Sequence, residues 1–374
     1  MKFLHTADIH LDTPFSMLDP EKAEQHRNEL RSTFASLVLY AKAQKVDLFL
    51  IAGDLFNNSF VTRETLSFLR REFESVPDCR FVIAPGNHDC FTEFSAYAKA
   101  DFPPNVFLFS KPHISCFSFD EIGVNVWGFA WCSKQFSQHV LSGFSLPPTK
   151  SINIFLGHAD VSGAASSVYA PITKEEIDAS GFDYMALGHI HNSDSISRIR
   201  DTYYGYSGCL EGRGFDETGY KGALVAELSK QNGVCSFNAK RLRFSKRHYE
   251  KETLDITGAG CLSDVAERIR AMLREKKYDS NTGVRVKLTG HVSARLCPDA
   301  ELLQQALPPL LRFEVQDNTV LESDVQNLRT DPTIRGAFYE SLLPYLQSED
   351  AAQRALGAAA LRYGLDALES TAGR

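Results

Sequence analysis

The sequence lacks any long apolar run, and this absence excludes a large class of proteins. No stretch approaches the roughly 18 apolar residues that would indicate a membrane-spanning helix, so we expect no membrane span. The segment that begins at Met1 also leaves no room for a signal peptide before the first candidate functional residue, Asp8. These two observations predict a cytoplasmic protein.

Paired cysteines and an excess of positive charge are missing as well. The eight cysteines are scattered without a Cys-x-x-Cys pair, which predicts reduced thiols rather than disulfides or a zinc knuckle. The formal net charge is −7, which gives no support to a nucleic-acid binder, because such binding depends on neutralising phosphates. One basic run, at residues 240–251, either follows a phosphate backbone or is a solvated strand and linker.

What the sequence does contain is a set of candidate metal ligands in five short segments, each directly after an apolar, strand-like run. The seven candidate ligands are Asp8, His10, Asp54, Asn87, His158, His189 and His191, and the same segments also contain His88 and Asp89. In open α/β sheets, ligands bind beyond the carboxyl ends of the strands, so we expect these side chains to share one rim. Carboxylates, a carboxamide and imidazoles suit manganese, iron or zinc, held as a pair by a shared carboxylate. The pattern therefore indicates a two-metal phosphoesterase.

The apolar patterns predict how the chain is organised. An amphipathic helix near residues 21–45 leads directly into the strand at residues 46–52, which is the start of a βαβ unit. Short strands dominate after residue 105. Alternating βα units followed by β-rich sequence predict an α/β fold with two sheets packed face to face and helices outside, over residues 1–245.

The sequence changes character near Ser245. Short strands and helices alternate over residues 250–325 and predict a small α+β cap domain. A helical tail follows at residues 331–370, and its first helix has an apolar face of Ile334, Phe338, Leu342 and Leu346. This face either packs on its own domain or docks on a partner.

The ordered motifs resemble those of the calcineurin-like metallophosphoesterases, and more narrowly the SbcD-type DNA repair exonucleases and their YhaO-like branch. The resemblance rests on the segments at residues 8–12, 169–171, 183–191 and 212–222. Residues 8 to about 225 carry specific motifs, whereas the cap resembles the family in pattern only. The resemblance implies an αββα metallophosphoesterase sandwich.

The resemblance also implies a role for each candidate residue. One divalent ion would be bound by Asp8, His10 and His191, the other by Asn87, His158 and His189, with Asp54 as the bridge. His88 would stabilise the transition state or protonate the leaving oxygen, and Asp89 would orient His88 or its loop. Asn57 stands where many relatives have aspartate, and we expect little consequence from that departure.

The function implied is hydrolysis of phosphodiester bonds by a hydroxide that two metal ions activate, in an exonuclease or endonuclease subunit of a DNA repair complex. Manganese is the expected metal, with iron or zinc as alternatives. The resemblance implies DNA as substrate, an SMC-like coiled-coil ATPase of the SbcC or YhaN type as partner, and leaves a homodimer open. The alternative is a cyclic-nucleotide or other small-molecule phosphodiesterase. A serine/threonine phosphatase is disfavoured, because residues 53–58 lack the Gly-Asp-x-x-Asp-Arg-Gly sequence that supplies a phosphate-binding arginine.

Overall fold

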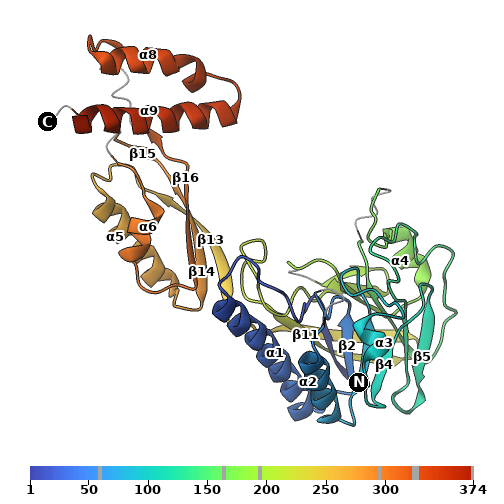
Figure 1. The fold of residues 1–374 in the computed structure, drawn as a ribbon. Helices are drawn as coiled ribbons and strands as arrows, with labels where there is room; N and C mark the ends of the chain where they lie inside the picture. The colour runs from blue at the N-terminus through green and yellow to red at the C-terminus, as the bar shows by residue number, and fades with distance from the viewer. Residues whose placement is uncertain (58–60, 162–165, 193–195, 294–295, 322–327, 372–374) are drawn as a thin grey trace. The chain divides into compact units, whose positions relative to one another are not determined.

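The computed structural model falls into two compact units, Met1–His248 and Tyr249–Arg374 (Figure 1). It describes residues 1–57, 61–161, 166–192, 196–293, 296–321 and 328–371. The end of the predicted cap, at residue 325, lies outside the described residues. Each unit is described below by itself.

The first sheet of unit 1 contains both parallel and antiparallel strands. Its order is β12-β11-β1-β2-β3-β4, with β1 to β4 parallel and β11 antiparallel to both of its neighbours. The strands are β1 (Lys2–Thr6), β2 (Leu48–Ala52), β3 (Arg80–Ala84), β4 (Val106–Leu108), β11 (Gly222–Gln231) and β12 (Val234–Arg243).

The second sheet has a parallel centre and an antiparallel strand at each edge, whereas the first has antiparallel strands at one edge only. Its order is β5-β6-β7-β8-β10-β9, and β6, β7, β8 and β10 run parallel. The strands are β5 (Ser115–Phe119), β6 (Val124–Gly128), β7 (Ile152–His158), β8 (Tyr184–Gly188), β9 (Ile196–Ile199) and β10 (Thr202–Tyr206). The connections also contain the short helical turns α3 (Ala96–Lys99) and η1 (Asp120–Ile122).

Strand β2 shows how the layers are assembled. Its alternate residues Leu48 and Leu50 belong to a core that also contains residues of β7 and β8, such as Leu156 and Tyr184, so this core lies between the two sheets. Phe49 and Ile51 belong instead to the core beneath helices α1 (Pro20–Ala43) and α2 (Arg63–Glu74). Helix α4 (Lys174–Ser180) packs on the outer face of the second sheet. The predicted two-sheet α/β sandwich with outer helices is confirmed.

Helix α1 forms where the sequence predicted it. Asp19 caps its first turn by accepting a hydrogen bond from the Lys22 backbone N–H, and Pro20 occupies a position that does not need an N–H donor. The buried face consists of Ala23, His26, Leu30, Arg31, Thr33, Phe34, Leu37, Val38 and Ala41. The apolar residues that the sequence pattern places on one face, namely Leu30, Phe34, Leu37, Val38 and Ala41, all belong to this set.

Unit 2 has a small α+β core of its own. Its three-stranded sheet has the order β13-β14-β16, and its strands are β13 (His248–Asp255), β14 (Thr282–Thr289) and β16 (Arg312–Asp317). Ile269 of α5 (Leu262–Lys276) and Leu303 of α6 (Ala300–Gln305) share one apolar core with the sheet. Unit 2 also contains a two-stranded parallel pair, β15 (His291–Val292) and β17 (Val320–Leu321).

Two helices, α8 (Ile334–Leu346) and α9 (Ala351–Thr371), pack against each other at the end of the chain (Figure 1). Their buried centre contains Leu328, Tyr339, Leu361 and Leu365. Of the face predicted for the first helix, Phe338, Leu342 and Leu346 pack against this centre, whereas Ile334 is 67% exposed. Three of those four residues are therefore used within the helix pair.

Two further observations concern membranes and disulfides. Over the described parts of the chain, none of the helices combines the length and the apolar character needed to span a bilayer. The eight cysteines, all of them in described segments, are free thiols.

Candidate metal centre

The candidate ligands follow the carboxyl ends of parallel strands in both sheets. Asp8 and His10 follow β1, Asp54 follows β2, and Asn87 and His88 follow β3. In the second sheet, His158 is the last residue of β7, and His189 and His191 follow β8. Because the two sheets pack face to face, these strand ends converge on one place, as expected for an α/β fold.

Several ligands sit in backbone conformations that non-glycine residues rarely adopt. The φ angles are 51° at Asp8, 52° at His10, 52° at Asp54 and 105° at His189. Such angles are costly and persist only where the surrounding structure enforces them, which is typical of functional sites. Here backbone hydrogen bonds join the segments after β1 and β2. The N–H of Asp8 donates to Gly53 O at 3.1 Å, and the N–H of His10 donates to Asp54 O at 2.9 Å.

Glycine at the strand ends allows the ligand segments to approach closely. A Cβ at Gly188 would lie 1.8 Å from the carbonyl oxygen of Ala52, and one at Gly53 would lie 2.4 Å from His158 Nδ1. Gly53 also has a φ of 88°, which L side chains rarely adopt. Glycine is therefore required before Asp54 and His189, because a side chain at either glycine would overlap the neighbouring segment.

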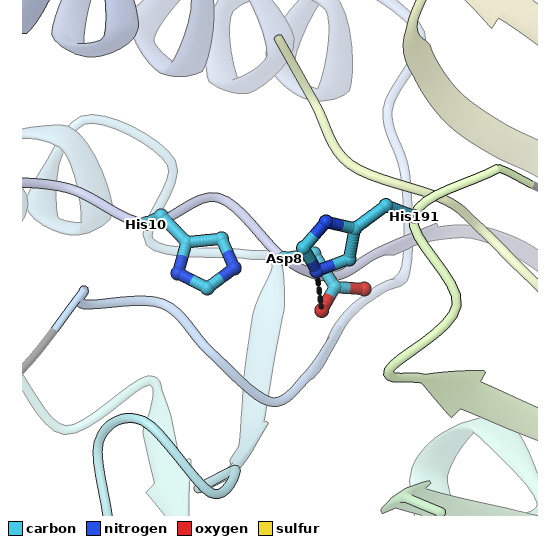
Figure 2. A group of neighbouring side chains, drawn as sticks. All are labelled: Asp8, His10 and His191. Carbon is cyan, nitrogen blue, oxygen red and sulfur yellow. Dashed lines mark ion pairs between the residues drawn. The ribbon is translucent and has the colours of Figure 1, made fainter. Parts of the chain in front are cut away.

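Asp8, His10 and His191 form the first group of ligand atoms, all within 4.8 Å of one another. Figure 2 shows the Asp8 carboxylate against the His191 ring, with the His10 ring beside them. Asp8 Oδ1 lies 3.3 Å from His191 Nε2. The sequence predicted these three residues for one ion.

Asp54 lies between the first group and a second one. Its Oδ2 is 3.8 Å from His10 Nε2 on one side and 3.5 Å from His158 Nε2 on the other. Asn87 Oδ1 lies 2.9 Å from the same His158 nitrogen. The same oxygen thus faces a proposed ligand of each ion, so Asp54 would be able to contribute to holding both, as the predicted bridge requires.

Two predicted residues lie differently from the rest. His189 contacts His158 edge-on, with ring centroids 5.4 Å apart, but among the described residues it belongs to none of the three-ligand groups. Its ring stacks on Tyr169 at 4.5 Å. His88, placed outside the metal shell by the sequence, offers a nitrogen within 4.8 Å of ligand atoms of His10 and Asp54. It is nevertheless exposed, whereas His10 and His158 are buried.

The buried atoms of His10 test whether this set of residues fits a metal. Neither ring nitrogen forms a hydrogen bond within the described part of the chain, although both are buried. A buried polar atom without a partner is costly, and a bound cation would satisfy it. Burial, reinforced by the charge of Arg213, holds the pKa of His10 well below its usual range. The ring is then neutral, which is the form that binds a metal, so the residues fit the group.

The charges of the centre support the same conclusion. Burial raises the pKa of Asp54 to about 7, although the charge of His158 opposes the rise. Burial lowers the pKa of His191, but hydrogen bonds to Asp8 and Glu217 outweigh that effect and raise it to about 10. Buried carboxylates and imidazoles therefore compete for protons here. A divalent cation would supply the positive charge that the carboxylates need.

Asp89 supports the loop rather than the His88 ring. Its carboxylate accepts hydrogen bonds from the backbone N–H of Phe56 at 3.0 Å, the backbone N–H of Gly86 at 2.7 Å and the Tyr97 hydroxyl at 2.6 Å. The His88 ring instead places Nδ1 3.1 Å from the carbonyl oxygen of Asn57. Of the two roles predicted for Asp89, the geometry favours orientation of the loop.

Sequence reasoning missed two residues beside the centre, Arg213 and Glu217. Glu217 Oε1 lies 2.6 Å from His191 Nδ1, and Arg213 Nη2 donates to the same oxygen at 2.7 Å. Both residues belong to a motif that the family resemblance includes, at residues 212–222, but no spacing rule links that motif to His191. A carboxylate behind a metal-binding histidine commonly fixes the ring and its tautomer.

The basic run after residue 239 is not a uniform surface. Arg241 donates hydrogen bonds to the carbonyl oxygens of Ser207 and Tyr206, and Arg247 pairs with Glu29. Lys240 and Arg243 are exposed, although Arg243 also lies over the Tyr220 ring. Arg241 and Arg247 therefore serve internal contacts, which neither of the two interpretations of this run included.

Comparisons with known proteins show the family to which the sequence is similar. Residues 1–193 match the family model described as calcineurin-like phosphoesterase. The chain is 28% identical over 365 residues to the uncharacterized metallophosphoesterase YhaO of Bacillus subtilis, with 90% of this chain and 86% of that protein covered. It is 24% identical over 383 residues to the SbcD subunit of the nuclease SbcCD of Staphylococcus saprophyticus, with 91% and 93% covered. Among solved structures, TT1561 of Thermus thermophilus aligns at 11% identity with a TM-score of 0.39, over 65% of this chain and 99% of that one.

Proposed function

We propose that this chain, which belongs to the calcineurin-like phosphoesterase family, is a two-metal phosphodiesterase that cleaves DNA. Within that family it belongs to the branch that includes YhaO and SbcD. One observation carries the two-metal part of the proposal: the Asp54 carboxylate lies between His10 and His158, at 3.8 and 3.5 Å.

The proposed ligands are those predicted from the sequence. One ion would be held by Asp8, His10 and His191, the other by Asn87, His158 and His189, and both by Asp54. Two divalent ions at such a site activate water and stabilise the negative charge that develops on a phosphate. Manganese suits this set of oxygen and imidazole ligands without thiolate, although iron or zinc would also bind.

The residues of the chain itself then position the substrate. His88 is exposed beside the buried ligands, and its Nδ1 is directed at the carbonyl oxygen of Asn57. That contact leaves Nε2 as the nitrogen that can reach a phosphate or a leaving oxygen. Asp89 keeps the loop around Gly86 in place, so that Asn87 and His88 are presented together.

The length of the match to a relative named as a nuclease subunit supports DNA as the substrate. It covers 91% of this chain, so it extends past unit 1 into unit 2. A small-molecule phosphodiesterase would have less need of such an added unit. We therefore propose a role for the protein in a DNA repair nuclease.

Hydrolysis is expected to depend on the metal and to be selective for DNA. Purified protein with manganese should be incubated in parallel with labelled linear DNA, cyclic AMP and a phosphopeptide. We expect cleavage of DNA, its loss in chelator, and the best recovery with manganese, because the ligands are oxygen and imidazole. Full activity after exhaustive metal removal would contradict the two-metal mechanism. Efficient cleavage of cyclic AMP without cleavage of DNA would favour the alternative substrate class.

We further propose that the helix pair of α8 and α9 docks on a coiled-coil ATPase. Because three residues of the predicted face pack inside the pair, the docking residues must be the apolar ones that stay outside. Ile334 is 67% exposed, Leu356 is 63% exposed and Tyr345 is 43% exposed. An apolar helix surface laid into a groove is a common mode of recognition.

Leu356→Glu is expected to abolish co-purification with the cognate ATPase while leaving the melting temperature and metal-dependent hydrolysis unchanged. The reason is that a charge on an exposed apolar contact costs binding but not folding. Leu302→Glu is the matched control, because Leu302 is 53% exposed on α6, outside the helix pair. A chain that ends at Glu322 should also fail to bind. Undiminished ATPase binding by the Leu356 variant and by the shortened chain would show that the dock lies elsewhere.

A further inference from the structure

The segment between β10 and β11 brings an arginine to the edge of the candidate metal centre. Arg213 lies on this segment, and its guanidinium is held firmly on one side by Glu217. Nη2 donates to Glu217 Oε1 at 2.7 Å and Nε to the same oxygen at 3.3 Å, while Glu217 Oε2 accepts the Arg213 backbone N–H at 2.7 Å. The arginine side chain is 18% exposed. Its position is therefore fixed, but its guanidinium is not sealed from solvent.

The other edge of the guanidinium faces the centre. Arg213 Nη2 lies 3.3 Å from His191 Nδ1, and Nη1 lies 3.4 Å from the side-chain oxygen of Asn57. The backbone oxygen of that same Asn57 contacts the His88 ring. Arg213 thus lies between a proposed metal ligand and the proposed catalytic histidine.

The contact with Asn57 is long for a hydrogen bond, whose donor and acceptor are usually about 2.7–3.2 Å apart. A neutral amide oxygen at 3.4 Å is a weak partner for a guanidinium, and an anionic oxygen would replace it readily. The guanidinium lies within 3.3 Å of His191, so its charge would attract a phosphate that entered the centre.

The motif that supplies a phosphate-binding arginine in serine/threonine phosphatases supplies none here. Serine/threonine phosphatases carry a phosphate-binding arginine directly after the position of Asn57, and this chain has Asn58 there. Arg213 reaches the Asn57 side chain from a segment far along the chain. A guanidinium therefore contacts Asn57, the residue that precedes the arginine in the sequence of that motif.

We propose that Arg213 binds a non-bridging oxygen of the substrate phosphate, with Glu217 as the residue that positions it. The inference rests on the proposed function and adds to it the residue that recognises the phosphate. The Nη1 edge leaves Asn57 and donates to the phosphate oxygen, while the Glu217 contacts stay in place. Arginine suits this task because its planar group keeps its charge and donates several hydrogen bonds in a fixed geometry.

The test compares Arg213→Gln and Arg213→Lys with the wild-type protein, each loaded with manganese. Arg213→Gln should raise the inhibition constant of inorganic phosphate and the KM for bis(p-nitrophenyl) phosphate by about 10- to 100-fold, the usual range for a lost charged hydrogen bond. Arg213→Lys should recover part of this loss, since lysine restores the positive charge but not the planar set of N–H donors. Arg80→Gln is the matched control, because Arg80 is also ion-paired, with Glu121, but lies at the amino end of β3.

Metal content separates substrate binding from a structural role. If Arg213 acted only by fixing Glu217 and His191, Arg213→Gln would lose manganese, and the proposal would be overturned. Unchanged phosphate inhibition and KM in Arg213→Gln would overturn it as well. Calorimetric titration of inorganic phosphate keeps the test independent of the substrate. If the wild-type protein bound phosphate but cleaved no DNA, the proposed function would fail, and weaker phosphate binding by Arg213→Gln would still support the role of Arg213.

Discussion

Asp54→Asn is expected to remove both metal ions and to reduce hydrolysis to the level of metal-free protein. The Asp54 carboxylate approaches His10 and His158 together, so its loss affects both ions at once. The loss of metal affinity and activity should be larger than the about 10- to 100-fold loss that follows mutation of a residue that only hydrogen-bonds to a metal ligand. Metal analysis by mass spectrometry, together with hydrolysis of bis(p-nitrophenyl) phosphate, measures both changes.

Asparagine is the sharper replacement because it preserves the local structure. Asp54 has a φ of 52°, a conformation that asparagine tolerates better than alanine does. The amide oxygen can also still accept the hydrogen bond that Asp54 Oδ1 receives from the His88 backbone N–H at 3.0 Å. The substitution therefore removes the charge and leaves the shape.

Thermal unfolding gives a second readout that does not need activity. Manganese at about 100 times its Kd should stabilise the wild-type protein by about 2.7 kcal/mol and raise its melting temperature by several degrees. The Asp54→Asn protein should show no such shift. Asp183→Asn is the matched control: Asp183 is also a buried carboxylate, but it pairs with Lys230 at 2.9 Å just before β8. That variant should be less stable but should keep the manganese shift, and a full shift in Asp54→Asn would contradict the bridge.

The sequence predicted the convergence of ligands because that convergence follows from strand geometry. Residues after the carboxyl ends of parallel strands share one edge of a sheet, so the positions of Asp8, Asp54 and His158 along the chain were enough to indicate a common site. The alternation of Leu48 and Phe49 between two cores follows from the same geometry, since β strands have a two-residue period.

Other contacts could not be predicted, because they depend on the path of a loop or on the choice of a partner. Nothing in the spacing of Arg213 and Glu217 shows that their segment folds back onto His191. The apolar pattern around Phe338 predicted a helix with one apolar face. The pattern does not show which element packs against that face, and in the structure α9 covers most of it. Likewise, the sequence left open whether Asp89 orients His88 or its loop, because adjacency does not fix which donors a carboxylate meets; here the donors are Tyr97 and backbone N–H groups.

The second large effect concerns His88. His88→Ala is expected to lower turnover by about 10²- to 10⁴-fold, the usual range for a lost general acid or base, while metal content and fold stay nearly unchanged. Metal content has to be measured as well as turnover, because a His88 nitrogen lies within 4.8 Å of ligand atoms of His10 and Asp54, close enough for His88 to be a ligand itself. Metal analysis beside single-turnover kinetics on labelled DNA distinguishes a ligand from a group that acts on the substrate.

A second substitution separates the two nitrogens of the ring. The amide of asparagine can reproduce the donor that Nδ1 offers to the carbonyl oxygen of Asn57, but it has nothing in place of Nε2. If Nε2 acts on the substrate, His88→Asn should be as slow as His88→Ala, whereas the exposed His113 should tolerate alanine without effect. Near-normal turnover in His88→Asn would instead mean that His88 serves only to hold the loop. Loss of both ions in either variant would make His88 a metal ligand, and the division of roles around Asp54 would have to be redrawn.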